Sequence, residues 1–456
     1  MKDINNILEK QKKFFDNGYT KDINFRIEAL KKLKYSIKIN ENNIFKALKK
    51  DLNKSEFETF ITEIGIVYDE INVAIKNIKK WSKTKKVRTP ITNFLASSYI
   101  YNEPYGIVLI MAPWNYPFQL VMAPLVGAIS AGNCILLKPS ELAVETEKII
   151  VDIIKDTFND EYISVVTGGV EESEALLKEK FDYIFYTGGI NVGKIVMKAA
   201  AENLTPITLE LGGKSPCIVD KDADIDLAAR RIAWGKFLNA GQTCVAPDYL
   251  IVHKNIKEKF ISLIEKYIVK FFGENSFESQ DYPRIINERH FRRLEGYLEE
   301  GKIIFGGKTD ISNLYIEPTI MEEINFKNRI MEEEIFGPIF PVIEFEYIDE
   351  IIDIVKINPN PLALYYFSQD KEKQEFIIKN ISFGGGCIND TIMHLATFTL
   401  PFGGVGSSGM GSYHGKMSFK TFSHKKSILK KSNLIDVKIR YAPFKGKINL
   451  AKKLFK

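Results

Sequence analysis

From residue 107 onward, short apolar runs alternate with segments of helical periodicity, and this alternation limits the chain to few folds. Helical patterns separate five such runs: "IVLIMAP" (107–113), "CILLKP" (134–139), "YISVVTGG" (162–169), "YIFYTGG" (183–189) and "ITLELGG" (207–213). Continuous apolar strands joined by helices are typical of a parallel sheet with helices on both faces. The sequence therefore predicts an α/β fold here.

A second alternating series begins near residue 216. Its runs include "PCIVD", "YLIVH", "PIFPVIEFEY" and "LALYYFS", separated by helical patterns, while residues 22–85 read as helices throughout. Because a single core stops growing near about 250–300 residues, a chain of 456 residues predicts two α/β domains, joined between "ELGGKSP" and Cys244. Ligand sites in such folds favour the cleft between domains.

Charge, apolar runs and cysteine usage exclude several classes of protein. The net charge is only +5 and no basic block dominates, so no nucleic-acid partner is expected. No run of about 18 apolar residues suggests a membrane span, and the first residues lack a signal-peptide core. The four cysteines have no CxxC spacing, which indicates a reduced, cytoplasmic protein. The five histidines show no metal-ligand spacing, so no metal site is expected.

Two glycine-rich segments imitate nucleotide-binding loops. "GVGSSG" (404–409) fits GxGxxG but follows Pro401 and Phe402 rather than a strand, so it is not expected to bind a dinucleotide. "GGINVGKI" (188–195) follows a strand and opens a helix, but Ile195 stands where a P-loop needs Ser or Thr for magnesium. What remains is a strand–Gly–helix turn whose backbone amides can face a diphosphate, which indicates a dinucleotide bound in an unusual way.

Two polar residues stand where reactive chemistry is possible. Cys244 lies among small and polar neighbours in "FLNAGQTCVAPDY" (237–249), although a free cysteine more often behaves as a small buried apolar residue. Asn115 lies in "APWNYPF" (112–118), after an apolar strand. Its amide either fixes a rigid turn or serves as an oxyanion donor at the carboxyl end of that strand.

Four charged residues are candidates for the site, and three of them allow two interpretations. Lys138 and Glu141 in "LLKPSE" (136–141) are either solvated charges or groups that hold ribose hydroxyls. Glu210 lies within an apolar strand, where burial raises the pKa of an unpaired carboxyl group. It is either an ion-paired or helix-capping glutamate or a general base that works near neutral pH. Glu334, in "EEEIFGP" (332–338), says little alone.

Together, these segments resemble the aldehyde dehydrogenase superfamily, and specifically its class 3, fatty-aldehyde-type branch. The resemblance runs from about residue 5 to about residue 445. Seven motifs carry it, in order and with compatible spacing: "PWNYPF", "LKPSE", "YTGGINVGKIV", "LTPITLELGGKSP", "GQTCVAPDY", "EEEIFGP" and "PFGGVGSSGMGSYHGK".

The resemblance implies a role for each candidate residue. Cys244 would be the nucleophile, Asn115 the oxyanion donor and Glu210 the base for deacylation. Tyr116 and Trp234 would line the aldehyde channel. The residues that would bind the cofactor are Trp114, Lys138 and Glu141 (the last two at the adenosine ribose), Gly188 and Gly193 at the diphosphate, Glu334 at the nicotinamide ribose and Phe336 against the nicotinamide.

The implied reaction is NAD(P)-dependent oxidation of medium-chain, long-chain or aromatic aldehydes to carboxylic acids, through a cysteine thiohemiacetal and thioester. The carboxylate of Glu141 favours NAD, and NADP is a second cofactor that this branch sometimes accepts. The implied fold is α/β. It has a Rossmann-like parallel-sheet cofactor domain (1–83 and 105–212), an α/β catalytic domain (213–412) and a small β bridging arm (84–104 and 420–437). The arm implies a homodimer.

Two alternatives and one departure accompany this interpretation. A coenzyme-A-acylating dehydrogenase is disfavoured because that branch lacks a glutamate at the place of Glu210, and a catalytically silent NAD-binding protein is disfavoured by the complete Cys–Asn–Glu set. The C-terminal tail (438–456) is basic and weakly amphipathic, whereas fatty-aldehyde relatives often end in a hydrophobic anchor. It either makes weak contact with a membrane surface or forms a solvated helix over the substrate mouth.

Overall fold

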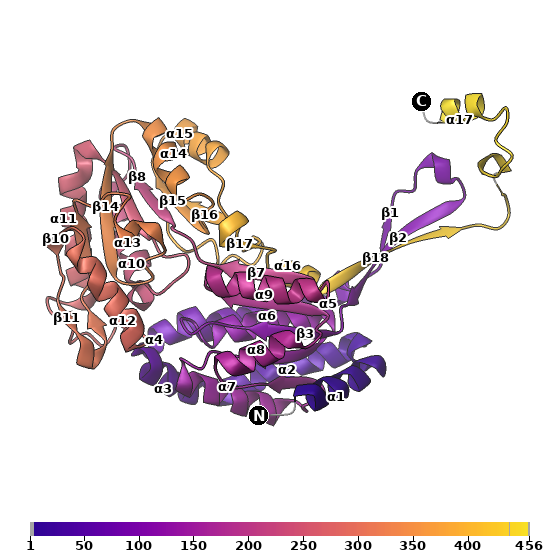
Figure 1. Ribbon diagram of the computed structural model, residues 1–456, viewed down its shortest axis with the longest axis horizontal. Coiled ribbons are helices and arrows are strands. Elements are labelled where there is room, and N and C mark those ends of the chain that lie inside the picture. Colours follow the sequence, from indigo (N-terminus) through magenta and orange to yellow (C-terminus); the bar gives the residue numbers. More distant parts are fainter. Residues whose placement is uncertain (1–3, 437, 455–456) are drawn as a thin grey trace.

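The computed structural model describes residues 4–436 and 438–454. Two sheets with their helices form the body of the molecule, and a third, narrow sheet projects from the body as an arm (Figure 1). The α/β class predicted from the alternating pattern is confirmed by this arrangement. The strand-like runs of the sequence form strands at the predicted positions.

The first sheet has six strands in the order β17-β7-β6-β3-β4-β5, and all neighbours are parallel except β17, which is antiparallel to β7. Every residue of β3 and β4 is buried, which explains their continuous apolar sequence. The strands are β3 (Ile107–Met111), β4 (Cys134–Lys138), β5 (Ile163–Val165), β6 (Tyr183–Gly188), β7 (Ile207–Leu211) and β17 (Gly409–Met410).

Helices from the N-terminal half of the chain pack on this sheet. Helix α6 (Gln119–Ala131) is buried along its whole length and contacts β3 and β4, as expected of a helix that is apolar on all sides. The others are α1 (Ile4–Asp16), η1 (Tyr19–Lys21), α2 (Ile23–Ile39), α3 (Glu41–Leu52), α4 (Glu56–Thr59), the π-helix η2 (Phe60–Ile64), α5 (Gly65–Trp81), α7 (Val144–Thr157), α8 (Val170–Lys178) and α9 (Ile190–Glu202).

The second sheet has seven strands in the order β10-β13-β14-β9-β8-β15-β16, all parallel except β10. They are β8 (Pro216–Val219), β9 (Tyr249–His253), β10 (Lys302–Phe305), β13 (Thr319–Glu322), β14 (Ile339–Phe345), β15 (Ala363–Phe367) and β16 (Gly385–Ile388). A separate strand pair joins β11 (Thr309–Asp310) to β12 (Tyr315–Ile316).

Helices and short helical turns complete the body around this second sheet. They are α10 (Ile225–Phe237), η4 (Leu238–Gly241), η5 (Lys254–Ile256), α11 (Lys257–Phe272), α12 (Glu288–Glu295), η6 (Gly296–Glu299), η7 (Ile311–Asn313), α13 (Arg329–Glu332), α14 (Ile348–Ile357), α15 (Lys371–Asn380), η8 (Gly406–Ser408) and α16 (Gly415–Thr421).

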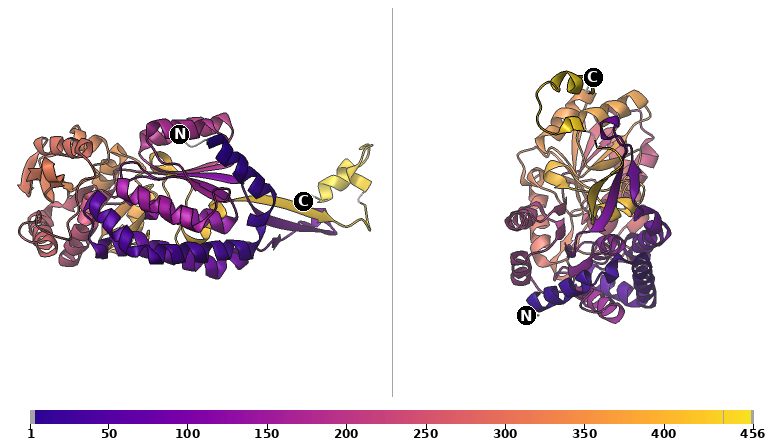
Figure 2. Two further views of the ribbon diagram at one scale, coloured as in Figure 1. Left: turned by 90° about the horizontal axis from the view of Figure 1, so that it is seen from below. Right: turned by 90° about the vertical axis from the view of Figure 1, so that its right-hand side faces the viewer.

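The arm consists of three antiparallel strands, β1 (Lys85–Val87), β2 (Ala96–Pro104) and β18 (Ser423–Lys431), with the turn η3 (Ile91–Asn93) between the first two. Strand β18 pairs with β2 along its whole length, from Ser423 opposite Pro104 to Lys431 opposite Ala96. These residues fall within the segments from which the sequence predicted a bridging arm. Figure 1 and the left view of Figure 2 show the arm extending away from both large sheets.

The C-terminal tail forms η9 (Lys438–Arg440) and α17 (Ile448–Leu454). Helix α17 lies at the far end of the arm (Figure 1), so within one chain it does not cover the body. None of the helices among the described residues is both long and apolar enough to cross a membrane.

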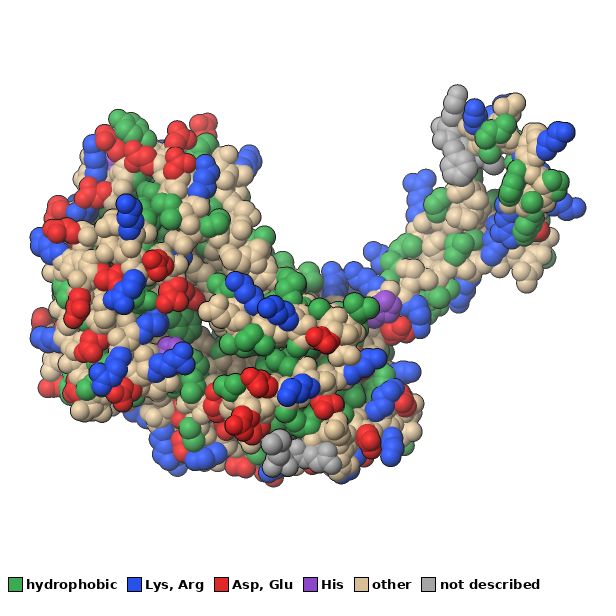
Figure 3. All heavy atoms as spheres, in the orientation of Figure 1, with side chains coloured by type: hydrophobic (Ala, Val, Ile, Leu, Met, Phe, Trp, Pro, Cys, Tyr) green, Lys and Arg blue, Asp and Glu red, His purple; other side chains and the backbone are tan. Residues whose placement is uncertain are grey.

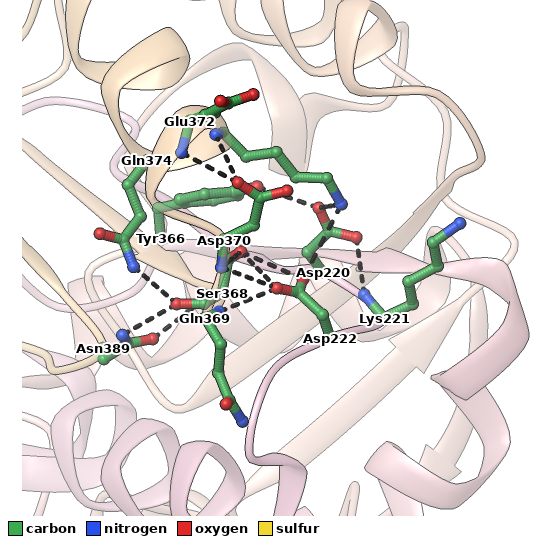
Figure 4. Close-up of polar contacts among 11 residues, drawn as sticks. Asp220, Lys221, Asp222, Tyr366, Ser368, Gln369, Asp370, Glu372, Gln374 and Asn389 are labelled. Carbon is green, nitrogen blue, oxygen red and sulfur yellow. Dashed lines mark hydrogen bonds and ion pairs between the residues drawn. The ribbon is translucent and has the colours of Figure 1, made fainter.

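A polar network ties the carboxyl ends of β8 and β15, where the strand order of the second sheet reverses (Figure 4). Asp222 accepts hydrogen bonds of 2.9 Å from the Ser368 hydroxyl and from the backbone N–H groups of Gln369 and Asp370. Burial raises the pKa of the Asp222 carboxyl, but these hydrogen bonds and the charge of Lys373 outweigh burial, so its pKa lies below the usual value. The network therefore favours the ionised carboxylate.

We expect Asp222→Asn to lower the free energy of unfolding by about 1–2 kcal/mol, because all three donors bond to one charged oxygen, Oδ2, and hydrogen bonds to a neutral amide oxygen are weaker. Urea unfolding at neutral pH measures this loss. A lowered native pKa contributes stability above the unfolded pKa of about 3.9 and loses it as pH falls through the native pKa. The difference between the variant and the parent should therefore shrink in acid.

Asp353→Asn is the matched control, because Asp353 pairs with Lys356 on an exposed helix surface where ion pairs contribute little. Equal effects of the two substitutions on unfolding would contradict a structural role for the network.

Candidate active site

The strand order of the first sheet reverses between β3 and β6. From β3 the chain adds β4 and β5 on one side of the sheet, and β6 and β7 then lie on the other side. Ligands of open α/β sheets bind in the crevice at the carboxyl ends of the strands at such a point. The loop 112–118 leaves β3 there, and Gly188 and Gly189 lead from β6 into α9 there. The two predicted cofactor and oxyanion segments therefore share one edge of the sheet.

Asn115 is buried, and its side chain is fixed by the loop that carries Cys244. Its Nδ2 donates a hydrogen bond of 3.0 Å to the backbone carbonyl of Gln242. An amide nitrogen carries two hydrogens, so one N–H remains available to another acceptor. The next residue, Tyr116, has its hydroxyl 2.6 Å from the Thr243 hydroxyl.

The backbone before Cys244 takes an unusual path through three consecutive left-handed residues. The φ values are 52° at Asn239, 51° at Ala240 and 73° at Gly241. A Cβ atom on Gly241 would lie 2.2 Å from the carbonyl oxygen of Gly337, so only glycine fits at this position. This path ends with Cys244 half-buried, at the wall of a cavity.

Glu210 is 3% exposed, and neither of its carboxyl oxygens has a hydrogen-bond partner among the described residues. It lies on β7 opposite Gly409 of β17, whose φ of 144° and close approach to Leu209 require glycine. The glycine-rich segment 404–409 therefore packs along β7 instead of forming a phosphate loop at the start of a helix. Burial raises the pKa of Glu210 well above its usual value.

Glu334 is a second carboxyl group near the cysteine, and it is half-buried. A Cβ atom on Gly212 would lie 1.9 Å from its Oε2, so the glycine makes room for the carboxyl group. Burial, and then the charge of Asp248, raises the pKa of Glu334 well above its usual value. Burial also raises the pKa of the Cys244 thiol, and the charges of Glu334 and Glu210 raise it further. The thiol and both carboxyl groups are therefore electrostatically coupled.

Phe336 and Trp114 pack edge to face, with ring centroids 5.3 Å apart. Phe336 has a φ of 52°, a strained conformation for an aromatic residue, and such strain is often found at functional sites. His290 also lies against Trp114, with ring centroids 4.9 Å apart. No local motif marks His290, and it was not predicted to be a site residue.

The remaining predicted cofactor residues lie along the carboxyl edge of the first sheet. Lys138 is buried at the end of β4, and its Nζ donates to the Pro139 carbonyl (2.8 Å) and to Glu141 (3.5 Å). A Cβ atom on Gly193 would lie 2.7 Å from Leu211, and its N–H already donates to the Gly189 carbonyl within α9. Gly193 thus has a packing role, and its amide is not free to meet a diphosphate.

A cavity of about 210 Å³ opens beside Cys244 and has a largely apolar lining. Tyr116 and Trp234, predicted to line the aldehyde channel, both face it. Its other lining residues are Ile61, Thr62, Ile66, Gln119, Leu120, Leu238, Thr243, Val245, Ile392, Met393, Leu395, Ala396, Phe402, Tyr413 and His414. The cavity is therefore built from segments that are far apart in the sequence.

Most of the residues that line this cavity were not predicted from the sequence. The sequence shows no metal-ligand spacing at His414, and no role was assigned to it. In the structure it lines the cavity, its ring stacks on Tyr413, and its Nδ1 lies 2.7 Å from Oε1 of the buried Glu70. Ile61 and Thr62 come from the π-helix η2, and π-helical turns are frequent at functional sites. No sequence motif marks His414, Ile61 or Thr62 as a lining residue. Their role becomes visible only when the distant segments that form the cavity are brought together.

The arrangement suits nucleophilic chemistry on an apolar carbonyl compound. It brings together a thiol at a cavity wall, an amide N–H from the neighbouring loop and two carboxyl groups near the sulfur, of which Glu210 is buried and Glu334 half-buried. The edge of the first sheet adds a helix N-terminus, at α9, without a side-chain cap. Such a terminus favours a phosphate group.

Comparisons with known proteins agree with this chemistry. Residues 1–428 match the aldehyde dehydrogenase family. A Staphylococcus aureus protein named 4,4'-diaponeurosporen-aldehyde dehydrogenase is 50% identical over 99% of this chain and 100% of its own. Aldehyde dehydrogenase family 3 member A2 of Pongo abelii is 45% identical over 96% of this chain and 90% of its own. The Rattus norvegicus enzyme named dimeric and NADP-preferring is 44% identical over 98% and 99%.

A solved structure described as the substrate-bound state of Staphylococcus aureus AldH superposes with a TM-score of 0.97, at 50% identity and over 100% of both chains. The chain therefore belongs to the aldehyde dehydrogenase family, in its class 3 branch, and is an enzyme that oxidises aldehydes to carboxylic acids with NAD or NADP.

Proposed function

We propose that this enzyme oxidises aldehydes with apolar chains, using Cys244 as nucleophile, Asn115 as oxyanion donor and Glu210 as base. The observation that carries the proposal is the apolar cavity of about 210 Å³ with the Cys244 thiol in its wall. The hydrogen bond from Asn115 to the Gln242 carbonyl supports the second role, because it joins the donor to the loop of the nucleophile.

The reaction begins when the Cys244 thiolate attacks the aldehyde carbon. A sulfur–carbon bond forms and the carbonyl oxygen takes the negative charge. The free N–H of Asn115 donates to this oxyanion, and one such donor typically contributes ~10²–10³ in rate. A bound dinucleotide would supply the hydride acceptor, with Phe336 and Trp114 holding its nicotinamide. Loss of the hydride from this carbon leaves Cys244 as a thioester.

Glu210 then removes a proton from the water that attacks the thioester carbon. The carbon–sulfur bond breaks, the carboxylic acid leaves and the thiolate returns. A carboxyl group without hydrogen-bond partners, whose pKa is raised by burial, suits a base that must gain and lose a proton near neutral pH. The same carboxylate favours water over coenzyme A as the acceptor, and the relatives give the acylating alternative no support.

The residues at the sheet edge fit a dinucleotide. The N-terminus of α9 has no side-chain cap, and a Cβ atom on Gly189 would contact nothing within 4 Å, so the amides of residues 190–192 can face a diphosphate. Lys138 and Glu141 would hold the adenosine ribose, Glu334 the other ribose, and Phe336 and Trp114 the nicotinamide. We assign residues 1–83 and 105–212 to cofactor binding and residues 213–412 to catalysis.

The second partner we propose is another copy of this chain, bound through the arm. Segments 84–104 and 423–454 contain thirteen Lys and Arg residues against two acidic ones, whereas the rest of the chain has more acidic than basic residues. Basic side chains follow the arm in Figure 3. The arm region also exposes large apolar residues, including Ile91 (87%) and Leu434 (89%). Such surfaces typically mark an interface.

We also propose a reducing, cytoplasmic location, because a thiol nucleophile needs one and all four cysteines are unpaired. Any contact of the basic tail with a membrane surface would be weak. The relative named 4,4'-diaponeurosporen-aldehyde dehydrogenase suggests that aldehyde as a substrate to compare with medium-chain and aromatic aldehydes in kcat/KM.

Substitutions at the two proposed chemical groups should fail at different steps. Cys244→Ala should abolish NADH formation, because no covalent intermediate forms. Glu210→Gln should release about one equivalent of NADH per site in a stopped-flow burst and then stall, because the thioester persists. In the parent, deacylation should slow as pH falls, because the base is protonated below its raised pKa. A Glu210→Gln variant that turns over at the parental rate would contradict the assignment.

Cofactor preference should depend on Glu141. Its carboxylate is 42% exposed, so rotation and solvent reduce its repulsion of a 2′-phosphate. We expect Glu141→Gln to raise kcat/KM for NADP relative to NAD by about tenfold, which corresponds to about 1.4 kcal/mol. Steady-state kinetics with both cofactors measure this ratio, and an unchanged ratio would place Glu141 away from the ribose.

Dimer formation should depend on the exposed apolar residues of the arm region. Ile91→Glu combined with Leu434→Glu should shift sedimentation from dimer toward monomer at micromolar concentration, because both substitutions place charge on the proposed interface. Leu204→Glu is the matched control, since Leu204 is equally exposed (89%) but lies after α9 on the body. A parental chain that sediments as a monomer would contradict the proposal.

A further inference from the structure

We propose that Lys54 and Glu63, a buried ion pair behind the loop 112–118, are positioning residues that set the location of the oxyanion donor. Neither side chain lines the cavity, and neither belongs to a motif that the reaction uses. The inference rests on the role proposed above for Asn115, and adds what holds that residue in place.

Lys54 lies just after α3, and its side chain is completely buried. Its Nζ donates a hydrogen bond of 2.7 Å to Oε1 of Glu63 and one of 3.1 Å to the backbone carbonyl of Asn115. The same ammonium group lies 4.0 Å from the centre of the Tyr116 ring, within the range of a cation–π contact. One side chain thus contacts both residues that the loop presents to the site.

Glu63 fixes the other end of the same loop. Its Oε2 accepts hydrogen bonds from the backbone N–H groups of Phe118 (3.1 Å) and Gln119 (2.9 Å), at the start of α6. A carboxylate at a helix N-terminus satisfies amides that have no partner within the helix. The ion pair therefore anchors the loop at Asn115 and again at its exit into α6.

Glu63 belongs to the π-helix η2, which also supplies Ile61 and Thr62 to the cavity wall. The extra residue of a π-helical turn lets neighbouring side chains face different directions. Here two side chains face the aldehyde cavity while Glu63 is completely buried against Lys54. The ion pair consequently links the position of the cavity wall to the position of the oxyanion donor.

A second tether reaches the Asn115 carbonyl from the cysteine loop. Asn239 donates through Nδ2 to that carbonyl at 2.8 Å, and its backbone N–H donates to the buried Glu58 at 3.0 Å. The Asn115 carbonyl oxygen therefore accepts two hydrogen bonds, one from each side. With its amide held by the Gln242 carbonyl, the whole residue is fixed in orientation.

A contribution to folding stability does not by itself explain the buried Lys54–Glu63 ion pair. Desolvating two charges is so unfavourable that apolar replacements of buried ion pairs are often neutral or stabilising. An apolar pair would pack as well, but it could not donate to the Asn115 carbonyl or accept from the start of α6. The structure thus assigns these charges a role in geometry, to which transition-state stabilisation is sensitive.

The test is a double-mutant cycle read out by the pre-steady-state burst of NADH formation. Lys54→Met should slow the burst rate constant roughly 10- to 100-fold, because the donor is displaced. Asn115→Ala should slow it roughly 10²- to 10³-fold. In the Asn115→Ala background, adding Lys54→Met should cost at most about twofold, because the residue that Lys54 positions has already been removed.

A purely structural role would give a different signal. A destabilised enzyme loses burst amplitude, which reports the active fraction, while its rate constant is preserved.

Lys54→Met leaves an unpaired buried carboxylate, so Lys54→Met with Glu63→Gln is the second variant. It removes both charges of the ion pair and keeps an acceptor oxygen for the N–H groups at the start of α6. Glu58 also lies in the field of Lys54, so we expect this variant to lose less thermal stability than Lys54→Met and still show the slower burst. Lys257→Met, which breaks an ion pair with Glu322 and Glu344 on the second sheet, is the control and should leave the burst unchanged.

Two results would overturn the inference. If Lys54→Met slows the burst by the same factor with and without Asn115, Lys54 does not act through Asn115, and the proposed reaction still stands. If Asn115→Ala slows the burst less than threefold, the proposed oxyanion role itself fails, and this inference fails with it.

Discussion

The hydrogen bond between the Asn115 side chain and the Gln242 carbonyl joins the two halves of the site. Asn115 follows a strand of the first sheet, and Gln242 lies in the loop that leads to the second. Each loop alone offers one reactive group at most. Their contact places an amide donor near the sulfur, at a cavity that neither sheet could enclose by itself.

Burial has two opposing consequences at this site. The thiol and both carboxyl groups near it have raised pKa values, chiefly because they are removed from solvent. An environment that disfavours charge suits an apolar substrate but opposes thiolate formation. The cavity must therefore admit polar partners in turn, and the absence of hydrogen-bond partners for Glu210 among the described residues leaves its oxygens available to such a partner.

The fold was predictable because local patterns encode it, and local motifs also mark the segments that carry the candidate reactive residues. Buried parallel strands such as β3 and β4 are continuous apolar runs, and the motifs around Cys244 and Asn115 are contiguous. The roles of individual residues remain predictions that kinetics can test. What sequence reasoning could not find depends on distant contacts: His414 meets Glu70 across 344 residues, and Lys54 meets Asn115 across 61. Gly193, assigned by motif to the diphosphate, packs closely against Leu211, a contact that the motif does not reveal, and its place at the diphosphate stays a prediction.

The body contains two largely parallel sheets, and the strand order of each reverses at one point. The residues at the carboxyl edge of the strands differ between these two points. In the first sheet the carboxyl edge carries glycines and an uncapped helix. In the second, Asp222 and Ser368 bond to each other across the same point and occupy it (Figure 4). The same sheet architecture thus appears twice. Its carboxyl edge is open to a ligand in the first sheet and is filled by side chains in the second. The expected stoichiometry is therefore a single dinucleotide per polypeptide.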